Sequence, residues 1–377
     1  MPPDVGMRVT VVAETFLPAV NGVVNSVLRV VDHLAVRGHD PVVVAPSGSS
    51  YESRCGARVE VVTVPAMRLP RYRQLPLARP AGDLTAVLRL LRPDVVHLAS
   101  PAVLGLAAAR AARALGAPSV AVFQTDLAAY AQRYRLPGGP AAAWRYLRTV
   151  HGTADLTLAP SSAAATQLTR QGIGPVALWP RGVDLDQFSP GHRDPALRAA
   201  LAPRGGLVVG VVARLAVEKR LELLAPLSVL PGVQLVVVGD GPQRRALERA
   251  MPRARFLGQL GGAELGAVVA SLDLFVHPGA DETFCQAVQE ALAAGVPAVV
   301  AASGGPLDLV RHRENGWLWA GDDPHVLAAM VAGLREDPTA LAAAAARARP
   351  SVDGRTWGRV GDELIEHLQR LRSPVPA

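Results

Sequence analysis

The feature that most constrains the fold is an alternation of short valine-rich runs with helical segments, which continues along nearly the whole chain. Near-continuous apolar runs of this kind are typical of strands buried on both faces of a parallel sheet. In the first half they are "RVTVVAE" (8–14), "DPVVVAP" (40–46), "RVEVVTVP" (58–65), "DVVHLAS" (94–100) and "PSVAVFQTD" (118–126). The sequence therefore predicts a doubly wound α/β domain.

The same cycle restarts after residues 186–206, a segment rich in Pro, Gly and charge that we interpret as a linker. The later runs include "GLVVGVVAR", "GVQLVVVGDG", "LDLFVHPG" and "VPAVVA". We predict domains at 1–190 and 191–355 and an amphipathic tail helix within 356–377. Ligands of such sheets bind outside the carboxyl ends of the strands, so we expect a cleft between the two domains.

Length and composition agree with two folded domains. A chain of 377 residues is too long for one ordinary core, and its apolar runs fall far short of the roughly 20 residues that span a bilayer. The start lacks the basic-then-apolar pattern of a secretory signal. Cys55 and Cys285 form neither a disulfide framework nor a metal-binding spacing. We expect a reduced, cytoplasmic protein without a metal.

The formal net charge of +7 favours an anionic partner. The arginines are scattered, without a basic helix or an aromatic-interleaved stripe, so we do not expect nucleic acid. Two segments combine Arg with Tyr, Trp and Leu, namely "RLPRYRQLPLARP" (68–80) and "QRYRLPGGPAAAWRYLR" (132–148). They fit peripheral contact with the anionic inner face of the plasma membrane, and an ordinary solvated surface explains them equally well.

Candidate site residues follow the first strand of each domain. Gly22 precedes a helix whose N–H groups would favour a phosphate, and a tight turn is the alternative. Its surroundings match neither G-x-G-x-x-G nor the P-loop. Arg214 ends a buried run and Lys219 follows five residues later. Two cations at the carboxyl edge of a sheet suit a diphosphate without a metal, and ordinary surface charge is the alternative.

Two carboxylates flank a later helix start in "DETFCQAVQEALAAG" (281–295). We expect Glu282 at or just before the helix start and Glu290 two turns further along. A helix cap and a solvated face would explain most such pairs. Here the helix follows a strand on the edge that Arg214 and Lys219 should also face, and this combination favours a binding site.

These motifs resemble the retaining glycosyltransferases of family 4, which have the GT-B fold: two facing Rossmann-like domains and a C-terminal helix that crosses back to the first. The Glu-x7-Glu motif is Glu282 to Glu290. The other matches are "GVDLDQFSP" (182–190), "ARLAVEK" (213–219), "VVVGDGP" (236–242), "FLGQL" (256–260), "ALAAGVPAVVA" (291–301), "GGPLDLV" (304–310) and the tail "TWGRVGDELIEHL". The resemblance covers essentially the whole chain.

The resemblance implies a role for each candidate. Glu290 should bind the ribose of a nucleotide-sugar donor, and Glu282 should bind hydroxyls of its sugar. Arg214 and Lys219 should hold the diphosphate. The remaining donor contacts would come largely from the backbone, at Gly22, Leu260, Thr283, Phe284, Cys285 and Gln286. No metal or other cofactor is expected.

One position departs from the commonest family pattern. Many relatives have a histidine beside the donor sugar, where this chain has Gln124 in "FQTDLAAYAQRY". The "QTD" variant resembles mannosyltransferases that use GDP-mannose, some of them on glycolipids. Gln124 can hydrogen-bond but cannot move a proton, which fits a mechanism in which the diphosphate takes the acceptor proton. Asp126 either orients a substrate or caps a helix.

The leading hypothesis is an α-mannosyltransferase with GDP-mannose as donor and a lipid-linked or glycolipid hydroxyl as acceptor. A family 4 enzyme that uses a UDP-sugar on a polysaccharide or secondary metabolite is the first alternative. A nucleotide-sugar epimerase and a non-catalytic nucleotide-binding module are alternatives of other classes.

Overall fold

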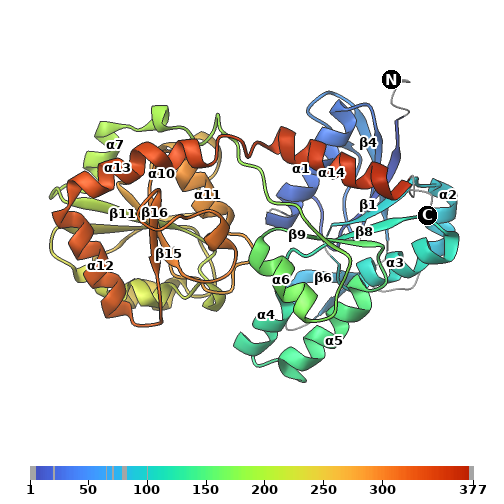
Figure 1. The fold of residues 1–377 in the computed structure, drawn as a ribbon, viewed down its shortest axis with the longest axis horizontal. Coiled ribbons are helices and arrows are strands. Elements are labelled where there is room, and N and C mark those ends of the chain that lie inside the picture. Colours follow the sequence, from blue (N-terminus) through green and yellow to red (C-terminus); the bar gives the residue numbers. More distant parts are fainter. Residues whose placement is uncertain are drawn as a thin grey trace. The chain divides into compact units, whose positions relative to one another are not determined.

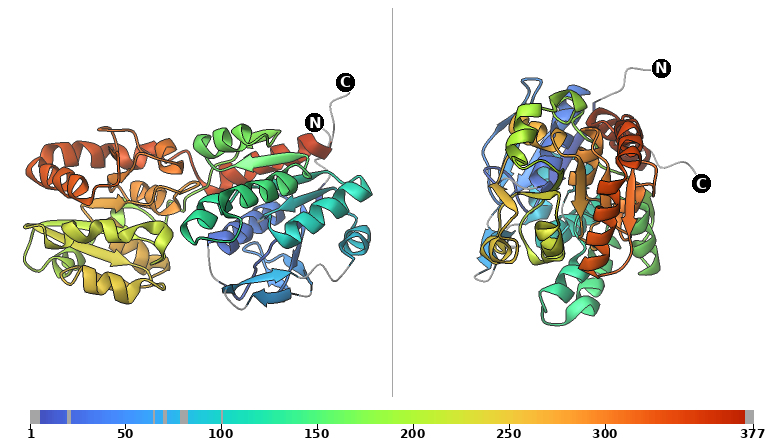
Figure 2. Two further views of the ribbon diagram at one scale, coloured as in Figure 1. Left: turned by 90° about the horizontal axis from the view of Figure 1, so that it is seen from below. Right: turned by 90° about the vertical axis from the view of Figure 1, so that its left-hand side faces the viewer.

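A computed structural model describes residues 6–19, 22–64, 66–69, 72–78, 83–99 and 101–372. The chain divides into two units (Figure 1), Met1–Pro180 with Trp357–Ala377, and Arg181–Thr356. Each unit is an open sheet with helices on both faces (Figure 2). Arg71 and the other side chains of segment 68–80 lie outside the described residues.

The sheet of the first unit is parallel apart from one short edge strand, β3, which pairs antiparallel with β4. Its order is β10 (Val176–Leu178), β9 (Leu156–Ala159), β8 (Ser119–Val122), β7 (Val95–Leu98), β1 (Arg8–Val12), β2 (Asp40–Ala45), β4 (Arg58–Thr63), β3 (Tyr51–Glu52). A separate antiparallel pair consists of β5 (Ala66–Leu69) and β6 (Tyr72–Ala78). The predicted strands of this domain are present, and β9 and β10 extend the sheet beyond them.

Successive side chains of each strand point to opposite faces of the sheet, so the first unit has two cores. Val9 and Val11 belong to the core under α1 and α14, whereas Val12 belongs to the core under α2 and α3. The helices are α1 (Gly22–Val36), α2 (Leu84–Leu91), α3 (Val103–Leu115), α4 (Leu127–Arg133), α5 (Gly139–His151), α6 (Ser162–Arg170) and α14 (Trp357–Arg372). Within the described ranges, no helix is long and apolar enough to cross a bilayer.

The sheet of the second unit has the strand order of a dinucleotide-binding fold. All its strands are parallel, and counted along the chain their order is 3-2-1-4-5-6. They are β13 (Arg255–Gly258), β12 (Val233–Val238), β11 (Leu207–Val212), β14 (Leu274–His277), β15 (Ala298–Ala301) and β16 (Gly316–Trp319). The order reverses between β11 and β14, and ligands of this fold bind outside the carboxyl ends of the strands at that point.

The helices of this unit cover both faces of its sheet. They are α7 (Pro195–Leu201), α8 (Ala225–Val229), α9 (Arg244–Ala250), α10 (Gly262–Ala270), α11 (Gln286–Ala293), α12 (Pro324–Glu336) and α13 (Pro338–Ala348). Five 3-10 turns complete it: η1 (Pro190–His192), η2 (Val217–Lys219), η3 (Leu221–Leu224), η4 (Gly305–Asp308) and η5 (Arg349–Ser351). The chain after β11 forms η2, η3 and α8 and not one continuous helix, because Arg220 adopts a left-handed conformation (φ 54°) between the 3-10 turns.

The second unit begins at Arg181, earlier than the predicted boundary at 190. Val183 N–H donates to the Arg355 carbonyl (2.8 Å), and Val183 pairs with Thr356. Phe188 and Leu201 are buried in the core of this unit. The segment 186–206 is therefore not a linker, because its apolar residues fold onto the second sheet.

The tail helix α14 packs on the first unit. Figure 1 shows it (red) beside α1 (blue), and Val360, Leu364 and Leu368 are buried in the core that the two helices share. The buried Trp179 indole donates a hydrogen bond to the Val360 carbonyl (2.9 Å). These contacts fix the helix to the first sheet.

Candidate active site

Lys219 and Glu282, predicted from distant parts of the sequence, meet at the switch point of the second sheet. Lys219 ends η2 after β11, and Glu282 lies in the loop after β14. Lys219 Nζ and Glu282 Oε1 are 2.6 Å apart. The loop that follows β15 supports this one, because Gly305 N–H donates to the Glu282 carbonyl (2.7 Å). A Cβ at Gly305 would lie 2.3 Å from the Phe284 Cα, so only glycine permits this approach.

His277, which the sequence reasoning did not select, completes the cluster. It is the last residue of β14 and only 2% exposed. Its Nε2 lies 2.9 Å from Glu282 Oε1, the oxygen that Lys219 also contacts. A signal was available, since a polar residue ends an otherwise apolar run at the carboxyl edge of the sheet.

The cluster keeps Glu282 ionised. Burial alone would raise the pKa of Glu282, but the charge of Lys219 and the hydrogen bond from His277 hold that pKa well below its ordinary range. Burial likewise acts to lower the pKa of His277, yet Cys285 and Glu282 raise it to about 10. Burial opposes the charged form of Lys219 too, and Glu282 nevertheless raises its pKa. The site therefore holds a carboxylate between two cations.

Lys219 is the chain's only lysine among 39 basic residues. Arginine supplies the positive charge everywhere else, so an ammonium at this one position indicates a specific requirement. Lysine is a compact point charge, whereas the guanidinium is a broad planar group. Lys219 therefore places a compact positive charge beside Glu282.

The Glu282 loop does not begin a helix at Glu282. Helix α11 starts at Gln286, after Cys285 in a left-handed conformation (φ 81°), so Glu282 is not a capping residue as one reading of the sequence had it. Phe284 is buried in the core and can offer a ligand only its backbone. Thr283, Phe284 and Cys285 thus lead into a helix amino terminus, where N–H groups lack intrahelical partners and favour an anion.

Glu290 lies on α11 in a different environment. Its carboxylate is partly buried, hydrogen-bonds with Gln286 and lies near Asp184. Burial raises the pKa of Glu290 to about 8. Gln286 also donates to the Gly182 carbonyl (3.0 Å). The two glutamates therefore differ in charge at neutral pH, which makes a shared catalytic role implausible.

Arg214 and Leu260 lie on the same edge of the sheet, after β11 and β13. Arg214 is exposed two residues beyond β11, and Leu260 is half-buried against the core of the unit. The intervening "VVVGDGP" turn is held by close backbone contacts. A Cβ at Gly239 would lie 1.9 Å from the Ala213 carbonyl oxygen, and Leu215 N–H donates to the Asp240 carbonyl (2.9 Å).

Gly22, Gln124 and Asp126 belong to the first unit. Gly22 begins α1, and a Cβ there would meet no atom of the described residues within 4 Å, so the described part of the fold does not demand glycine. Gln124 follows β8, and its amide donates to the Ala99 carbonyl. Asp126 caps α4 by accepting from Ala128 N–H (3.0 Å), and its other oxygen accepts from Gln167 (2.8 Å). The geometry thus favours the capping role of Asp126.

The strand order of the first sheet also reverses, between β1 and β7. Glu14, which follows β1, is 7% exposed and accepts from Ala102 N–H (3.1 Å) and Gly105 N–H (2.9 Å) at the start of α3. Burial raises its pKa to about 7. Sequence reasoning did not select Glu14, whose contacts are those of a helix cap supplied by a neighbouring strand.

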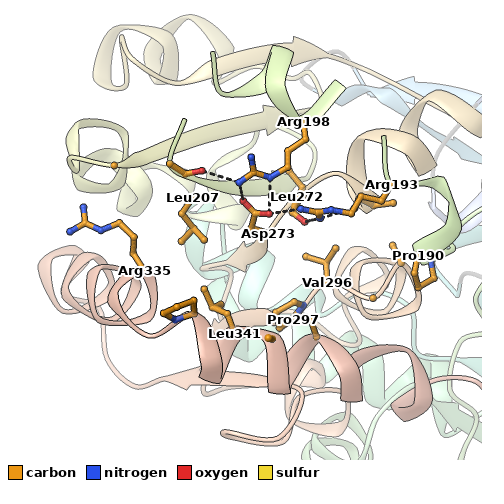
Figure 3. Close-up of a pocket in the computed structure, with 18 residues that line it drawn as sticks. Pro190, Arg193, Arg198, Leu207, Leu272, Asp273, Val296, Pro297, Arg335 and Leu341 are labelled. Atoms are coloured by element: carbon orange, nitrogen blue, oxygen red, sulfur yellow. Dashed lines mark hydrogen bonds and ion pairs between the residues drawn. The ribbon is translucent and has the colours of Figure 1, made fainter. Parts of the chain in front are cut away.

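A cavity of about 660 Å³ lies at the opposite edge of the second sheet, where strands begin (Figure 3). Asp273, just before β14, binds both Arg193 and Arg198 at 2.6 Å. These pairs attach the segment leading into α7 to the sheet. None of the predicted site residues lines the cavity. Its charged residues Asp273, Arg193 and Arg198 form ion pairs with one another.

Comparison with known proteins identifies the family. The family model described as Glycosyltransferase Family 4 matches residues 20–187, and the one described as Glycosyl transferases group 1 matches residues 206–337. The GDP-mannose-dependent alpha-mannosyltransferase of Corynebacterium glutamicum is 47% identical over 365 residues, which are 96% of this chain and 88% of that protein. The chain belongs to glycosyltransferase family 4.

The glycosyltransferase also resembles more distant proteins. The GDP-mannose-dependent alpha-(1-6)-phosphatidylinositol dimannoside mannosyltransferase of Mycobacterium tuberculosis is 26% identical over 96% of each chain. The crystal structure of Anabaena HepE in complex with UDP-glucose matches with a TM-score of 0.76 and 20% identity, over 96% of this chain and 99% of that one. The predicted GT-B fold class is confirmed, and so is the prediction of an enzyme: the chain is an α-mannosyltransferase of this family.

Proposed function

We propose that this glycosyltransferase moves mannose from GDP-mannose to a hydroxyl of a lipid-linked or glycolipid acceptor, with retention of anomeric configuration. The observation that carries the proposal is the Lys219–Glu282–His277 cluster at the switch point of the second sheet. The donor follows from the name of the Corynebacterium relative. The acceptor class follows from the phosphatidylinositol dimannoside enzyme.

The diphosphate of the donor would bind where positive charge converges. Lys219 and the exposed Arg214 supply two cations, and the amino terminus of α11 supplies N–H groups from the loop that contains Cys285. Gly22, at the start of α1, would let its backbone approach a phosphate closely, since it has no side chain. A diphosphate would share the Lys219 ammonium with Glu282.

The two glutamates would bind opposite ends of the donor. Glu290, one turn into α11, would accept hydrogen bonds from the ribose hydroxyls. Glu282, held ionised by two cations, would accept from hydroxyls of mannose. Backbone groups near Leu260 would contact the base. This division of roles agrees with the opposite pKa shifts of the two carboxyls.

Stabilisation of the leaving diphosphate is the main catalytic demand. As the glycosidic bond breaks, negative charge grows on the diphosphate, and fixed cations stabilise it more than they stabilise the ground state. The diphosphate oxygen would take the acceptor proton, so no protein base is needed. Gln124 would orient the acceptor or sugar by hydrogen bonds alone, and Asp126 would support it through the start of α4.

We propose further that the donor binds without a metal or other cofactor. Atoms of His277, Glu282 and Cys285 lie within 4.8 Å of one another and are of types that ligate metals. The ammonium of Lys219 is already bonded to the same carboxylate oxygen that a metal would use. A cation entering this cluster would have to displace two positively charged side chains.

Peripheral contact with an anionic membrane would bring the enzyme to a glycolipid acceptor. The α4–α5 segment presents Tyr130 and Tyr134, stacked at 4.2 Å, together with Arg133 and Arg135. Aromatic and basic residues together suit the interface of an anionic bilayer. Binding to anionic vesicles should fall when Arg71, Arg73, Arg133 and Arg135 are replaced, and unchanged binding would exclude this surface.

The test of the proposed function is transfer from radiolabelled GDP-mannose to a membrane lipid extract, with the anomeric configuration of the product read by NMR. We expect an α-mannosyl lipid, formed equally well in EDTA. Transfer only from a UDP-sugar would replace the donor assignment. A product epimerised at the sugar, or nucleotide binding without turnover on any acceptor, would favour the epimerase or the non-catalytic module.

A further inference from the structure

His277 is a buried histidine whose ring is restrained at the carboxyl end of a strand. It is the last residue of β14, and its Nε2 lies 2.9 Å from Glu282 Oε1. The Cys285 side chain is a second hydrogen-bonding neighbour of the ring. A Cβ at Gly279 would lie 2.8 Å from Nε2, so the backbone of the loop passes close to this nitrogen. These contacts restrain the imidazole with Nε2 directed at Glu282.

Both cationic partners of Glu282 contact the same oxygen. Lys219 Nζ lies 2.6 Å from Oε1, the atom that His277 Nε2 also contacts. An ionised carboxylate can only accept hydrogen bonds, so Nε2 is the donor. Within the described ranges Oε2 has no hydrogen-bond partner, and the Glu282 side chain is 14% exposed. Oε1 therefore anchors the side chain, and Oε2 remains available for a ligand hydroxyl.

We propose that His277 is a positioning residue that keeps Glu282 Oε2 directed at the donor sugar while Lys219 binds the diphosphate. The inference rests on the proposed function, in which Glu282 binds the mannose and Lys219 the diphosphate. Rotation about the Cγ–Cδ bond of Glu282 exchanges its two oxygens. Two donors on Oε1 oppose this rotation, and His277 is the donor that the diphosphate does not share.

The need for His277 increases during the reaction. Negative charge grows on the diphosphate as the glycosidic bond breaks, so the diphosphate attracts the Lys219 ammonium more strongly than in the ground state. The ammonium is thereby drawn away from Glu282. His277 has no part in binding the diphosphate in the proposed site, and its hydrogen bond to Oε1 persists. Loss of His277 should therefore lower kcat more than it raises KM.

His277→Leu and His277→Gln test the proposal, because leucine has no donor and glutamine keeps an N–H near the position of Nε2. The measurements are GDP release from GDP-mannose in the presence of a membrane lipid extract, GDP binding by calorimetry and a thermal melt. In His277→Leu, kcat should fall roughly 10- to 100-fold, the loss expected for a hydrogen bond to a charged group. GDP binding should stay unchanged, because GDP has no sugar to position. His277→Gln should be several-fold more active than His277→Leu.

The pair of His33 and Asp362 supplies a matched control. His33 Nε2 lies 2.7 Å from Asp362 Oδ1, a histidine–carboxylate contact of the same kind in the first unit, where α1 packs on α14. His33→Leu should lower Tm and leave kcat, KM and GDP binding unchanged. A role of His277 in folding alone would give His277→Leu this same pattern.

Three results would overturn the proposal: parental kcat in folded His277→Leu, loss of GDP binding in proportion to kcat, or His277→Gln no more active than His277→Leu. If His277→Leu does not fold, His277→Phe takes its place, since it keeps a ring without a donor. The proposed function fails separately, when the parent enzyme releases no GDP from GDP-mannose. If the parent then turns over UDP-glucose, the same variants decide the role of His277 with that donor. Inactivity with both donors would overturn both proposals.

Discussion

Binding of the nucleotide sugar should strengthen as the pH rises from 6 to 8, because Glu290 must ionise to accept hydrogen bonds from two ribose hydroxyls. Burial raises the pKa of Glu290 to about 8. With this value, about 1% of the carboxyl is ionised at pH 6 and about half at pH 8. The apparent dissociation constant varies inversely with the competent fraction, so binding should be about 50-fold tighter at pH 8.

Calorimetry with GDP-mannose measures this effect, since the diphosphate diester does not titrate between pH 6 and 8. Titrations in two buffers of different ionisation enthalpy should show release of nearly one proton at pH 6. Glu290→Gln, which cannot ionise, should bind weakly at both pH values and show no proton release. Constant affinity of the parent enzyme from pH 6 to 8 would refute the reasoning about Glu290.

The raised pKa of Glu290 also makes the folding stability depend on pH. The folded-state pKa of Glu290 lies above its ordinary value, so the folded protein holds the proton more tightly than the unfolded chain. The stabilisation of the folded state by this tighter proton binding is complete below pH 4.5 and is lost as the pH rises through about 8. Glu290→Gln should therefore become more stable relative to the parent as the pH rises, which thermal melts at pH 5 and 8 would show.

Three further predictions concern separate parts of the structure. Lys219→Met should lower kcat/KM by about 100-fold or more, since a cation is lost from the developing diphosphate anion, and Lys219→Arg should restore little of it. Gly22→Ala should leave Tm unchanged, because a Cβ there meets no atom within 4 Å in the part of the chain that the structure describes, and should weaken GDP-mannose binding in calorimetry. Leu364→Ala should destabilise the protein by about 2–5 kcal/mol in urea titrations, whereas the exposed Glu366→Ala should change it by less than about 0.5 kcal/mol.

Strand and helix periodicity were sufficient to predict both sheets apart from strands β3, β9 and β10. Valine runs buried on both faces are typical of a parallel sheet between helix layers, and both sheets are parallel apart from the edge strand β3. Helices α5 and α6 were not predicted, and the possible cap at Asp126 was the one indication of α4. The prediction that segment 186–206 is a linker was wrong. Pro and Gly indicate turns, but they do not reveal whether neighbouring residues such as Phe188 are buried.

The site was predictable where a residue's position followed from strand topology. Arg214, Lys219 and Glu282 each follow a strand at the edge where ligands bind, so their common edge could be predicted, whereas the direct contact between Lys219 and Glu282 was not predicted. His277 was missed because strand prediction treats the last residue of an apolar run as core. The conformation of Cys285 was also not readable from the sequence, because it depends on how the loop packs against Gly305 and its neighbours.

The most direct test of the account is a calorimetric comparison of GDP, UDP and ADP, without added metal, on the parent enzyme and on Lys219→Met. The account predicts selective binding of GDP that Lys219→Met weakens and that EDTA leaves unchanged. Preference for UDP would contradict the donor assignment and leave the site standing. Absence of binding by all three nucleotides, or full binding by Lys219→Met, would contradict the assignment of the site itself.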